Sequence, residues 1–369
     1  MKQHHNSKRV YDLVIPISPT CVIVSGSEMI QACSTSYLAL NWDANVRERI
    51  ANALNVGGQD LFASLGSNYL GGLHPSKEKL EQVMAELTLY ERCLALSSGW
   101  TANYAIAEYV GNNFEHIISH PNNHNSIIEG LRKFKDKVSI LKIDEDILES
   151  LFHRPGRTAI IYPSIEGITG EQSIIPPKNQ HSDKVILISD ESHSFGMFGN
   201  RGLDTPNGQR PDIRILGFSK ALGSVGAIIT GQTETIEWLE QASSPWIFST
   251  PLPPYIWDIN TLLLSASLDF KAERDAIFDS ASYFRERLRI AKIPFTGDHH
   301  ITGLNLQIRC SAREAETFLF SRQVFLKISG YPSVKYGTSR ARVVFNQYHS
   351  RKEIDCVFDS VFALYQKYN

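Results

Sequence analysis

The chain has 369 residues, of which 42% are hydrophobic and 21% charged, a composition typical of a soluble globular protein of more than one domain. Its 37 basic and 39 acidic residues leave a net charge of −2, which gives no electrostatic case for binding nucleic acid or an anionic membrane. The five cysteines contain no CxxC pair, the N-terminus is polar, and no apolar run reaches the ~18 residues of a spanning helix. We therefore expect a cytoplasmic protein with reduced thiols.

Short apolar runs alternate with amphipathic runs through the middle of the chain. The strand-like runs are Cys93–Leu96, His116–Ser119, Val138–Leu141, Ala159–Tyr162, Val185–Ser189 and Ile213–Phe218. The helix-like runs are Pro75–Leu89, Thr101–Val110 and Asp144–Phe152. This alternation predicts an α/β fold, with a mostly parallel central sheet covered by helices on both faces.

The pattern changes after Pro245, where several prolines interrupt the chain. A long helical region at Tyr255–Ala291, strands at Gly303–Ile308 and Arg342–Phe345, and a helix at Lys352–Lys367 follow. These elements predict a smaller α+β domain. We expect a large domain over 46–250 and a small C-terminal domain over 251–369, which the strand-rich segment 1–45 joins.

Two charged residues follow predicted buried strands. Lys220 comes after Ile213–Phe218, and Asp190 comes after Val185–Ser189. Ligands of open α/β sheets bind at the carboxyl ends of the strands. A lysine there can form a Schiff base with the aldehyde of pyridoxal phosphate (PLP), and an aspartate can keep the pyridine nitrogen protonated. The pair therefore indicates a PLP enzyme, although either residue alone is also explained by solvation or by a turn cap.

Two earlier segments add to this interpretation. Ser98-Gly99-Trp100 follows a strand and opens a helix, whose free amides suit a phosphate group, although an ordinary helix cap explains the same residues. His124 can stack on a flat ring or simply lie in a surface loop. The order of phosphate loop, histidine, aspartate and lysine between residues 98 and 220 is stronger than any single signal.

His193 lies three residues after Asp190 and can reach the ring hydroxyl of the cofactor or the substrate. The Asp-Glu-x-His spacing also permits a metal site, but no second ligand cluster with suitable spacing is found, so no metal is predicted. Ser219 precedes Lys220, and glycines surround the pair, as close approach of the backbone to a cofactor requires.

Over about residues 33–350 the chain resembles the α-oxoamine synthases, PLP-dependent transferases of fold type I in aminotransferase class I/II. The family pattern Asp-Glu-Ala-His-Ser-x-Gly is matched at Asp190–Gly196, with Ser192 in place of alanine. Ser-Lys-Ala-x-Gly-x-x-Gly is matched at Ser219–Gly226. Further matches are Ser98-Gly99-Trp100, His124–Gly130 and Trp246–Pro254.

The resemblance implies an acyltransferase that condenses an amino acid, or a related amine donor, with a fatty acyl-CoA. It implies catalytic roles for Lys220, Asp190, His193 and His124, all of which would also contact PLP. The further cofactor-binding residues that it implies are Ser98, Gly99, Trp100, Ser219 and Thr250. In the family that threonine reaches the phosphate of the partner subunit, which implies a homodimer with its active site at the subunit interface.

The segment Leu94–Asn103 and the serine at 192 are most similar to the autoinducer synthases of Vibrio and Legionella. The resemblance therefore implies a quorum-sensing role, with an aminoketone or α-hydroxyketone precursor as product. The alternatives are an enzyme like 8-amino-7-oxononanoate synthase, another α-oxoamine synthase, or a plain class I/II aminotransferase. The acyl chain length, the amino donor and the final product stay open.

Two departures from the family pattern concern binding groups. Gly217 stands where the family has threonine or serine, so a hydroxyl for the phosphate is missing, and Ser219 is a candidate to replace it. Gly330 stands where the resemblance places the arginine that binds the substrate carboxylate. Bidentate carboxylate binding favours arginine. The candidates to replace it are Lys327, Lys335, Arg340 and Arg342.

Overall fold

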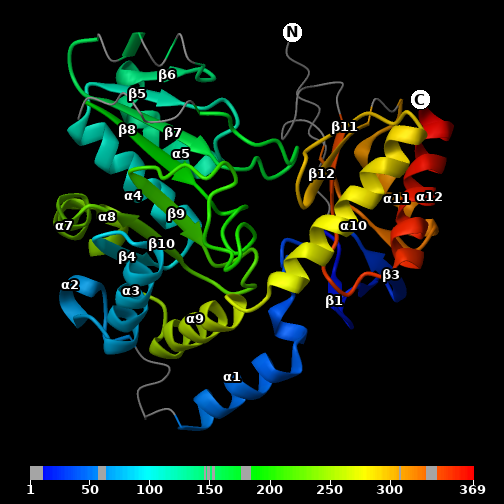
Figure 1. Cartoon of the computed structure of the whole chain (residues 1–369), viewed down its shortest axis with the longest axis horizontal. Coiled ribbons are helices and arrows are strands. Elements are labelled where there is room, and N and C mark those ends of the chain that lie inside the picture. The colour runs from blue at the N-terminus through cyan, green and yellow to red at the C-terminus, as the bar shows by residue number, and fades with distance from the viewer. Residues whose placement is uncertain are drawn as a thin grey trace.

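The computed structural model describes residues 11–56, 64–144, 147, 150–151, 154–175, 184–306, 309–329 and 339–369. A seven-stranded sheet forms the centre of the larger part (Figure 1). In spatial order its strands are β4 (Arg92–Leu96), β10 (Ala227–Gly231), β9 (Ile213–Gly217), β8 (Val185–Asp190), β7 (Thr158–Pro163), β5 (His116–Ser119) and β6 (Val138–Ile140). Only β10 runs antiparallel to its neighbours, so the predicted mostly parallel sheet is confirmed.

Helices cover both faces of this sheet because its strands are apolar on both sides. In β4, Leu94 and Leu96 pack with helices α4 (Gly99–Asn113), α5 (Asn125–Leu131) and α7 (Thr233–Ala242). Cys93 and Ala95 point the other way and pack with α3 (Pro75–Thr88) and α9 (Pro254–Ser267). The alternation along one strand thus separates two hydrophobic layers.

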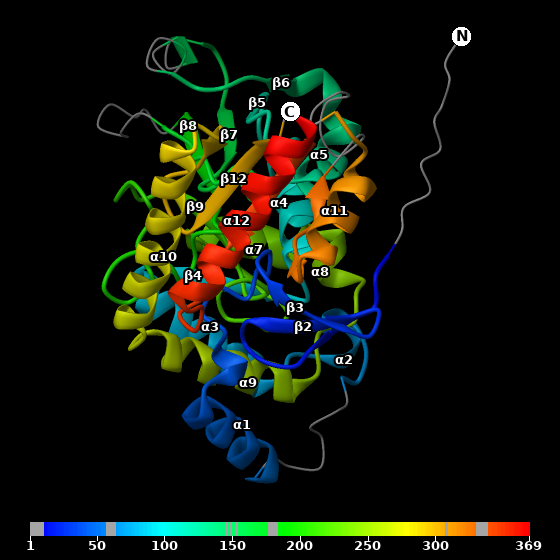
Figure 2. The same ribbon diagram turned by 90° about the vertical axis from the view of Figure 1, so that its right-hand side faces the viewer.

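Two smaller sheets lie beside the large one. The first contains β1 (Val14–Pro16), β2 (Cys21–Val24), β3 (Ser27–Gln31) and β13 (Val324–Phe325). The second contains β11 (Phe295–Thr296), β12 (Ile301–Leu306), β15 (Ser339–Val344) and β14 (Ile328–Ser329). Because β13 pairs in parallel with β3, the N-terminal strands share a sheet with a strand from the last part of the chain. Figure 2 shows these blue strands beneath the red helix α12 (Arg351–Tyr368).

The remaining elements are helices that connect or cover these sheets. They are η1 (Leu40–Trp42), α1 (Ala44–Val56), α2 (Asn68–Gly71), η2 (Arg132–Lys137), α8 (Ser244–Ile247), α10 (Lys271–Ile290) and α11 (Ala312–Ser321). None of the helices in the described part of the chain combines the length and the apolar composition needed to cross a membrane.

The helical region expected at Tyr255–Ala291 consists of two helices, α9 and α10. They separate because α9 packs against α3, whereas α10 packs against α12 in the C-terminal part. Most of the helix expected at Asp144–Phe152 lies outside the described residues. The division into domains at residues 45 and 250 stays a prediction.

Candidate active site

A cavity of about 440 Å³ lies at the carboxyl ends of β7, β8 and β9. This volume is within the range of small-molecule sites in proteins. Its lining residues are Ser98, Gly99, Trp100, Asn103, Asn122, His124, Pro163, Ile165, Glu166, Gly167, Ile168, Asp190, Ser192, His193, Ser219, Lys220 and Arg342. All the predicted site residues are therefore brought together except Thr250, which lies near Ser97 and Trp246 in a separate small hollow.

Asp190 is the last residue of β8 and is buried. Its Oδ2 accepts a 2.8 Å hydrogen bond from Nδ2 of Asn103, and its Oδ1 accepts one of 3.0 Å from the backbone amide of Ser192. These donors fix the carboxylate at the cavity wall. Sequence reasoning missed Asn103, whose only signal is its amide side chain one turn beyond Gly99 on α4.

Lys220 follows β9 in a tight loop. The backbone amide of Phe218 donates to the carbonyl of Gly226 over 3.0 Å, and Gly223 and Gly226 both have positive φ values, which glycine adopts at low cost. Burial lowers the pKa of the Lys220 amine, and the positive charge of Arg342 lowers it further. A larger fraction of this lysine is therefore unprotonated near neutral pH, and able to accept a proton, than of an exposed lysine.

His193 is partly buried and pairs with the fully buried Tyr37, which comes from the segment between β3 and α1. The Tyr37 hydroxyl and His193 Nδ1 are 2.6 Å apart. Burial, with the charges of Lys220 and Arg342, holds the pKa of His193 well below its ordinary value. Burial also raises the pKa of Tyr37, so both partners are neutral. Sequence reasoning missed Tyr37, which carries no motif signal.

The phosphate-binding prediction falls at the start of α4. Ser98 caps this helix, because its hydroxyl accepts a 3.1 Å hydrogen bond from the backbone amide of Thr101. The alternative of an ordinary helix cap is thus confirmed, and phosphate binding stays a prediction. The amides of the first turn have no carbonyl acceptor within the helix, and Gly99 and Trp100 line the cavity, so this end of α4 can bind an anion.

His124 caps α5 and is exposed on the cavity side, with Nδ1 2.7 Å from the Ser126 hydroxyl. Its ring meets the Trp100 ring edge to face, with the centroids 6.0 Å apart. Two flat side chains from different helices thus form an aromatic wall beside Asp190 and Lys220. Such a wall suits a planar heteroaromatic ligand.

Arg342 reaches the cavity from β15, in another sheet. Its Nη1 donates a 2.7 Å hydrogen bond to the carbonyl of Gly167, while its Nε is buried without a partner among the described residues. Lys327 instead bonds Asp12 and Glu316, at 3.0 and 2.6 Å. Arg340 does not line the cavity.

Gly330 and Lys335 lie outside the described residues. Of the described candidates for carboxylate binding, Arg342 is therefore the one in the cavity. Sequence reasoning named Arg342 as one of several candidates but did not include it among the predicted site residues.

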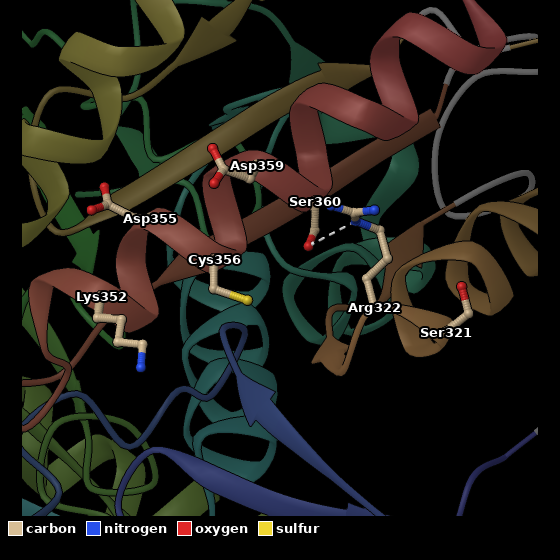
Figure 3. Close-up of a pocket in the computed structure, with 7 residues that line it drawn as sticks. All are labelled: Ser321, Arg322, Lys352, Asp355, Cys356, Asp359 and Ser360. Atoms are coloured by element: carbon tan, nitrogen blue, oxygen red, sulfur yellow. Dashed lines mark hydrogen bonds between the residues drawn. The ribbon is translucent and has the colours of Figure 1, made fainter.

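A second hollow, of about 460 Å³, lies on α11 and α12 (Figure 3). It is lined by Ser321, Arg322, Lys352, Asp355, Cys356, Asp359 and Ser360. Several of its polar groups pair within the fold: Arg322 Nε donates to the Ser360 hydroxyl over 3.3 Å, and Asp355 accepts a 2.8 Å bond from Tyr283. It contains none of the predicted site residues and shows no comparable chemistry.

The residues of the first cavity fit PLP. Asp190 offers a carboxylate for a ring nitrogen, Lys220 is an amine with a lowered pKa, and α4 offers free amides. Asn103 also has a buried Oδ1 without a partner in the described part of the chain. The described residues contain no cluster of His, Cys, Asp or Glu side chains that could hold a metal ion.

Comparisons with known proteins agree with this chemistry. Residues 177–361 match the family "Aminotransferase class I and II". An 8-amino-7-oxononanoate synthase of Thermoanaerobacter pseudethanolicus is 30% identical over 351 residues, which cover 90% of this chain and 87% of that protein. One from Thermosipho melanesiensis is 28% identical, covering 90% of this chain and 88% of that protein. These relatives favour an enzyme like 8-amino-7-oxononanoate synthase over the autoinducer synthases.

Solved structures show the same fold. A serine palmitoyltransferase from S. paucimobilis has a TM-score of 0.85 at 19% identity and covers 96% of this chain and 92% of that chain. An 8-amino-7-oxononanoate synthase from Francisella tularensis has a TM-score of 0.74 at 22% identity, with 92% and 98% covered. Together with the family match and the site geometry, they show that this chain belongs to aminotransferase class I and II, as a PLP-dependent enzyme of the α-oxoamine synthase type with fold type I.

Proposed function

We propose that the protein joins the Cα of an amino acid to the acyl carbon of an acyl-CoA thioester. The amino acid loses its carboxyl group as CO₂, the thioester loses CoA as the thiol, and the product is an α-aminoketone. The observation that carries this proposal is the convergence of Lys220, Asp190, His193 and Arg342 on one cavity. The Arg342 guanidinium there suits the carboxylate of an amino-acid substrate.

PLP, when bound, supplies an electron-withdrawing ring that makes the Cα proton of the amino acid removable. Asp190 would hold the ring nitrogen, and His124 would lie against the ring. Lys220 Nζ would hold the cofactor aldehyde at rest. Its lowered pKa also suits the free amine to accept the Cα proton.

Neutral His193 would act as a hydrogen-bond donor. The Tyr37 hydroxyl has no other acceptor among the described residues, so it donates to His193 Nδ1, and the imidazole proton then lies on Nε2. That atom faces Gly167 on the cavity wall, because a Cβ placed on Gly167 would lie 2.4 Å from it. Nε2–H could thus bind an oxygen of the cofactor or the substrate.

Arg342 would bind the substrate carboxylate. Among the described residues its guanidinium donates to two backbone carbonyls, that of Gly167 over 2.7 Å and that of Cys33 over 3.5 Å, and its Nε has no partner, so further N–H donors are available. A planar fork of donors matches a carboxylate better than a point charge does. This assignment would explain how the enzyme works with glycine at position 330.

We further propose a homodimer. Large apolar side chains are exposed on and beside α2: Leu65 is 87% exposed, Tyr69 77% and Leu70 82%. Asn68 Nδ2 donates to the carbonyl of Trp246 over 2.9 Å, which ties this segment to α8, whose C-cap Phe248 is 79% exposed. Several large apolar side chains exposed on neighbouring segments favour a protein partner, and Thr250 lies two residues beyond Phe248.

The Lys220→Ala variant tests the chemistry. Purified wild-type protein should show the visible absorbance of lysine-bound PLP and should release CoA from an acyl-CoA when an amino acid is supplied. The variant should lose both. A variant that keeps both would refute the proposal. CoA release without a keto-acid co-substrate separates this reaction from that of a plain aminotransferase.

The biological product is a finer proposal. The relatives favour an activity like that of 8-amino-7-oxononanoate synthase, whereas Trp100 and Ser192 are the residues that favour an autoinducer synthase. Acyl-CoAs of graded length, with products identified by mass spectrometry, separate the two. Preference for medium or long unsubstituted chains supports the signal synthase, and preference for a carboxylated acyl chain supports the alternative.

A further inference from the structure

Ser192 and Gly217 meet at the cavity, from the ends of neighbouring strands β8 and β9. A Cβ built on Gly217 would lie 3.0 Å from the Ser192 hydroxyl oxygen and 3.3 Å from its Cβ. A Cβ on Gly99, the first residue of α4, would lie 3.8 Å from the same oxygen. The Ser192 hydroxyl therefore occupies the space into which a side chain at 217 would extend, and it lies beside the amide-rich end of α4.

The Ser192 hydroxyl is free to bind a ligand. The backbone amide of Ser192 donates to Asp190 Oδ1 over 3.0 Å, but its hydroxyl has no hydrogen-bond partner in the parts of the chain that the structure describes. Ser192 lines the cavity and is only partly buried. An oriented hydroxyl near free helix amides suits an anionic oxygen.

We propose that the Ser192 hydroxyl donates a hydrogen bond to the phosphate of PLP and replaces the hydroxyl that Gly217 lacks. The two positions are the places where the sequence has serine for alanine and glycine for threonine or serine, and the structure puts them in contact. The hydroxyl that the family pattern has at the end of β9 is thus supplied here by a residue that follows β8. This inference rests on the placement of the phosphate at α4 that the proposed function assumes.

Ser219 is the competing candidate. It also lines the cavity, but its side chain is exposed, and it does not come within 4 Å of a Cβ placed on Gly99, whereas the Ser192 hydroxyl does. Ser192 is adjacent to both glycines. The geometry thus favours Ser192 over the neighbour of Lys220.

The contact makes the two positions interdependent. With Ser192 present, a threonine at 217 would be crowded, because 3.0 Å is shorter than an ordinary carbon–oxygen contact. With alanine at 192 the 3.0 Å contact is removed and only the 3.3 Å contact with the Cβ of residue 192 remains, so a threonine at 217 is less crowded and supplies its own hydroxyl. Gly217 has no positive φ and belongs to β9, so its backbone accepts a β-branched residue.

The test compares PLP with pyridoxal, which lacks the phosphate, in titrations of apoprotein followed by visible absorbance. Ser192→Ala should weaken PLP binding about tenfold to a hundredfold, as loss of a hydrogen bond to a charged group predicts, and should change pyridoxal binding little. The double variant Ser192→Ala/Gly217→Thr should recover PLP affinity. The matched control Ser219→Ala should retain wild-type affinity for both.

Three results would overturn the inference: an unchanged ratio of PLP to pyridoxal affinity in Ser192→Ala, a loss in Ser219→Ala instead, or a double variant that binds PLP no better than Ser192→Ala. Should the Gly217→Thr substitution prevent folding, the Ser192→Ala ratio decides alone. Failure of the proposed function would look different, because wild-type protein would then show no lysine-bound PLP absorbance.

Discussion

Replacing His300 by leucine should reduce the free energy of unfolding that the protein loses when the pH falls. His300 is fully buried against the Tyr37 ring, with centroids 4.5 Å apart, and neither of its ring nitrogens has a hydrogen-bond partner among the described residues. Burial, helped by the charge of neighbouring His299, lowers its pKa from 6.5 to about 3. The folded protein therefore keeps this imidazole neutral at a pH where the unfolded chain protonates it.

Because the pKa is depressed in the folded state, the stability contribution is complete above pH 6.5 and is lost as the pH falls toward 3. Because pH 5 is 1.5 units below the ordinary pKa of 6.5, protonation of this histidine stabilises the unfolded chain by about 2 kcal/mol at pH 5. His300→Leu should remove this loss. At pH 7.5 the variant should be nearly as stable as wild type, since it deletes unpartnered buried nitrogens.

Urea unfolding at pH 7.5 and pH 5, followed by tryptophan fluorescence, measures the effect. The free energy of unfolding should fall about 2 kcal/mol less in His300→Leu than in wild type between the two values. His349→Leu is the contrast, because His349 is buried but bonded to Asn346 at 3.0 Å and to the Gln31 carbonyl at 2.9 Å. The His349→Leu variant should have a free energy of unfolding about 1–3 kcal/mol below that of wild type already at pH 7.5. An equal fall in His300→Leu and wild type would refute the reasoning.

Three other substitutions have defined outcomes. Arg342→Ala should raise the KM for the amino acid about tenfold to a hundredfold and leave the KM for acyl-CoA nearly unchanged, and Arg342→Lys should recover only part; equal effects on both substrates would argue against carboxylate binding. Tyr37→Phe should lower kcat about tenfold and mix the His193 tautomers, which nitrogen-15 NMR detects; unmixed tautomers would contradict this role. Glu191→Gln should destabilise the fold by about 3–5 kcal/mol in urea, because it leaves the buried Arg214 cation without the negative charge that now lies 2.6 Å from it, and Arg214→Met added to it should restore part of the loss.

The sequence predicted the central sheet and most of the cavity for the same reason. Asp190 and Lys220 follow apolar runs of strand length, and parallel strands place their carboxyl ends at one edge, so neighbouring strands bring such residues together without any knowledge of the loops. Ser98 and Gly99 are predictable because helix starts carry local signals, whereas His124 was singled out for its imidazole and its match to the family pattern. These residues needed only short-range patterns.

Residues that reach the cavity from other parts of the fold were not predictable in this way. Tyr37 belongs to the segment between two N-terminal elements, and Arg342 belongs to a strand of another sheet. Their position depends on how the small sheets pack against the large one, which no periodicity encodes. Thr250 lies outside the cavity of the single chain. A role for it would depend on a second subunit.

The pairing of β3 with β13 constrains how the protein is made. Residues 27–31 leave the ribosome early, but the strand that completes their sheet, Val324–Phe325, is translated near the end. The last strand of the seven-stranded sheet ends at Gly231, so this sheet can form first. Until β13 is made, strand β3 of the N-terminal hairpin has an unpaired edge. Premature termination before residue 324 should therefore yield a nascent chain that holds its main core yet exposes an edge strand open to aggregation.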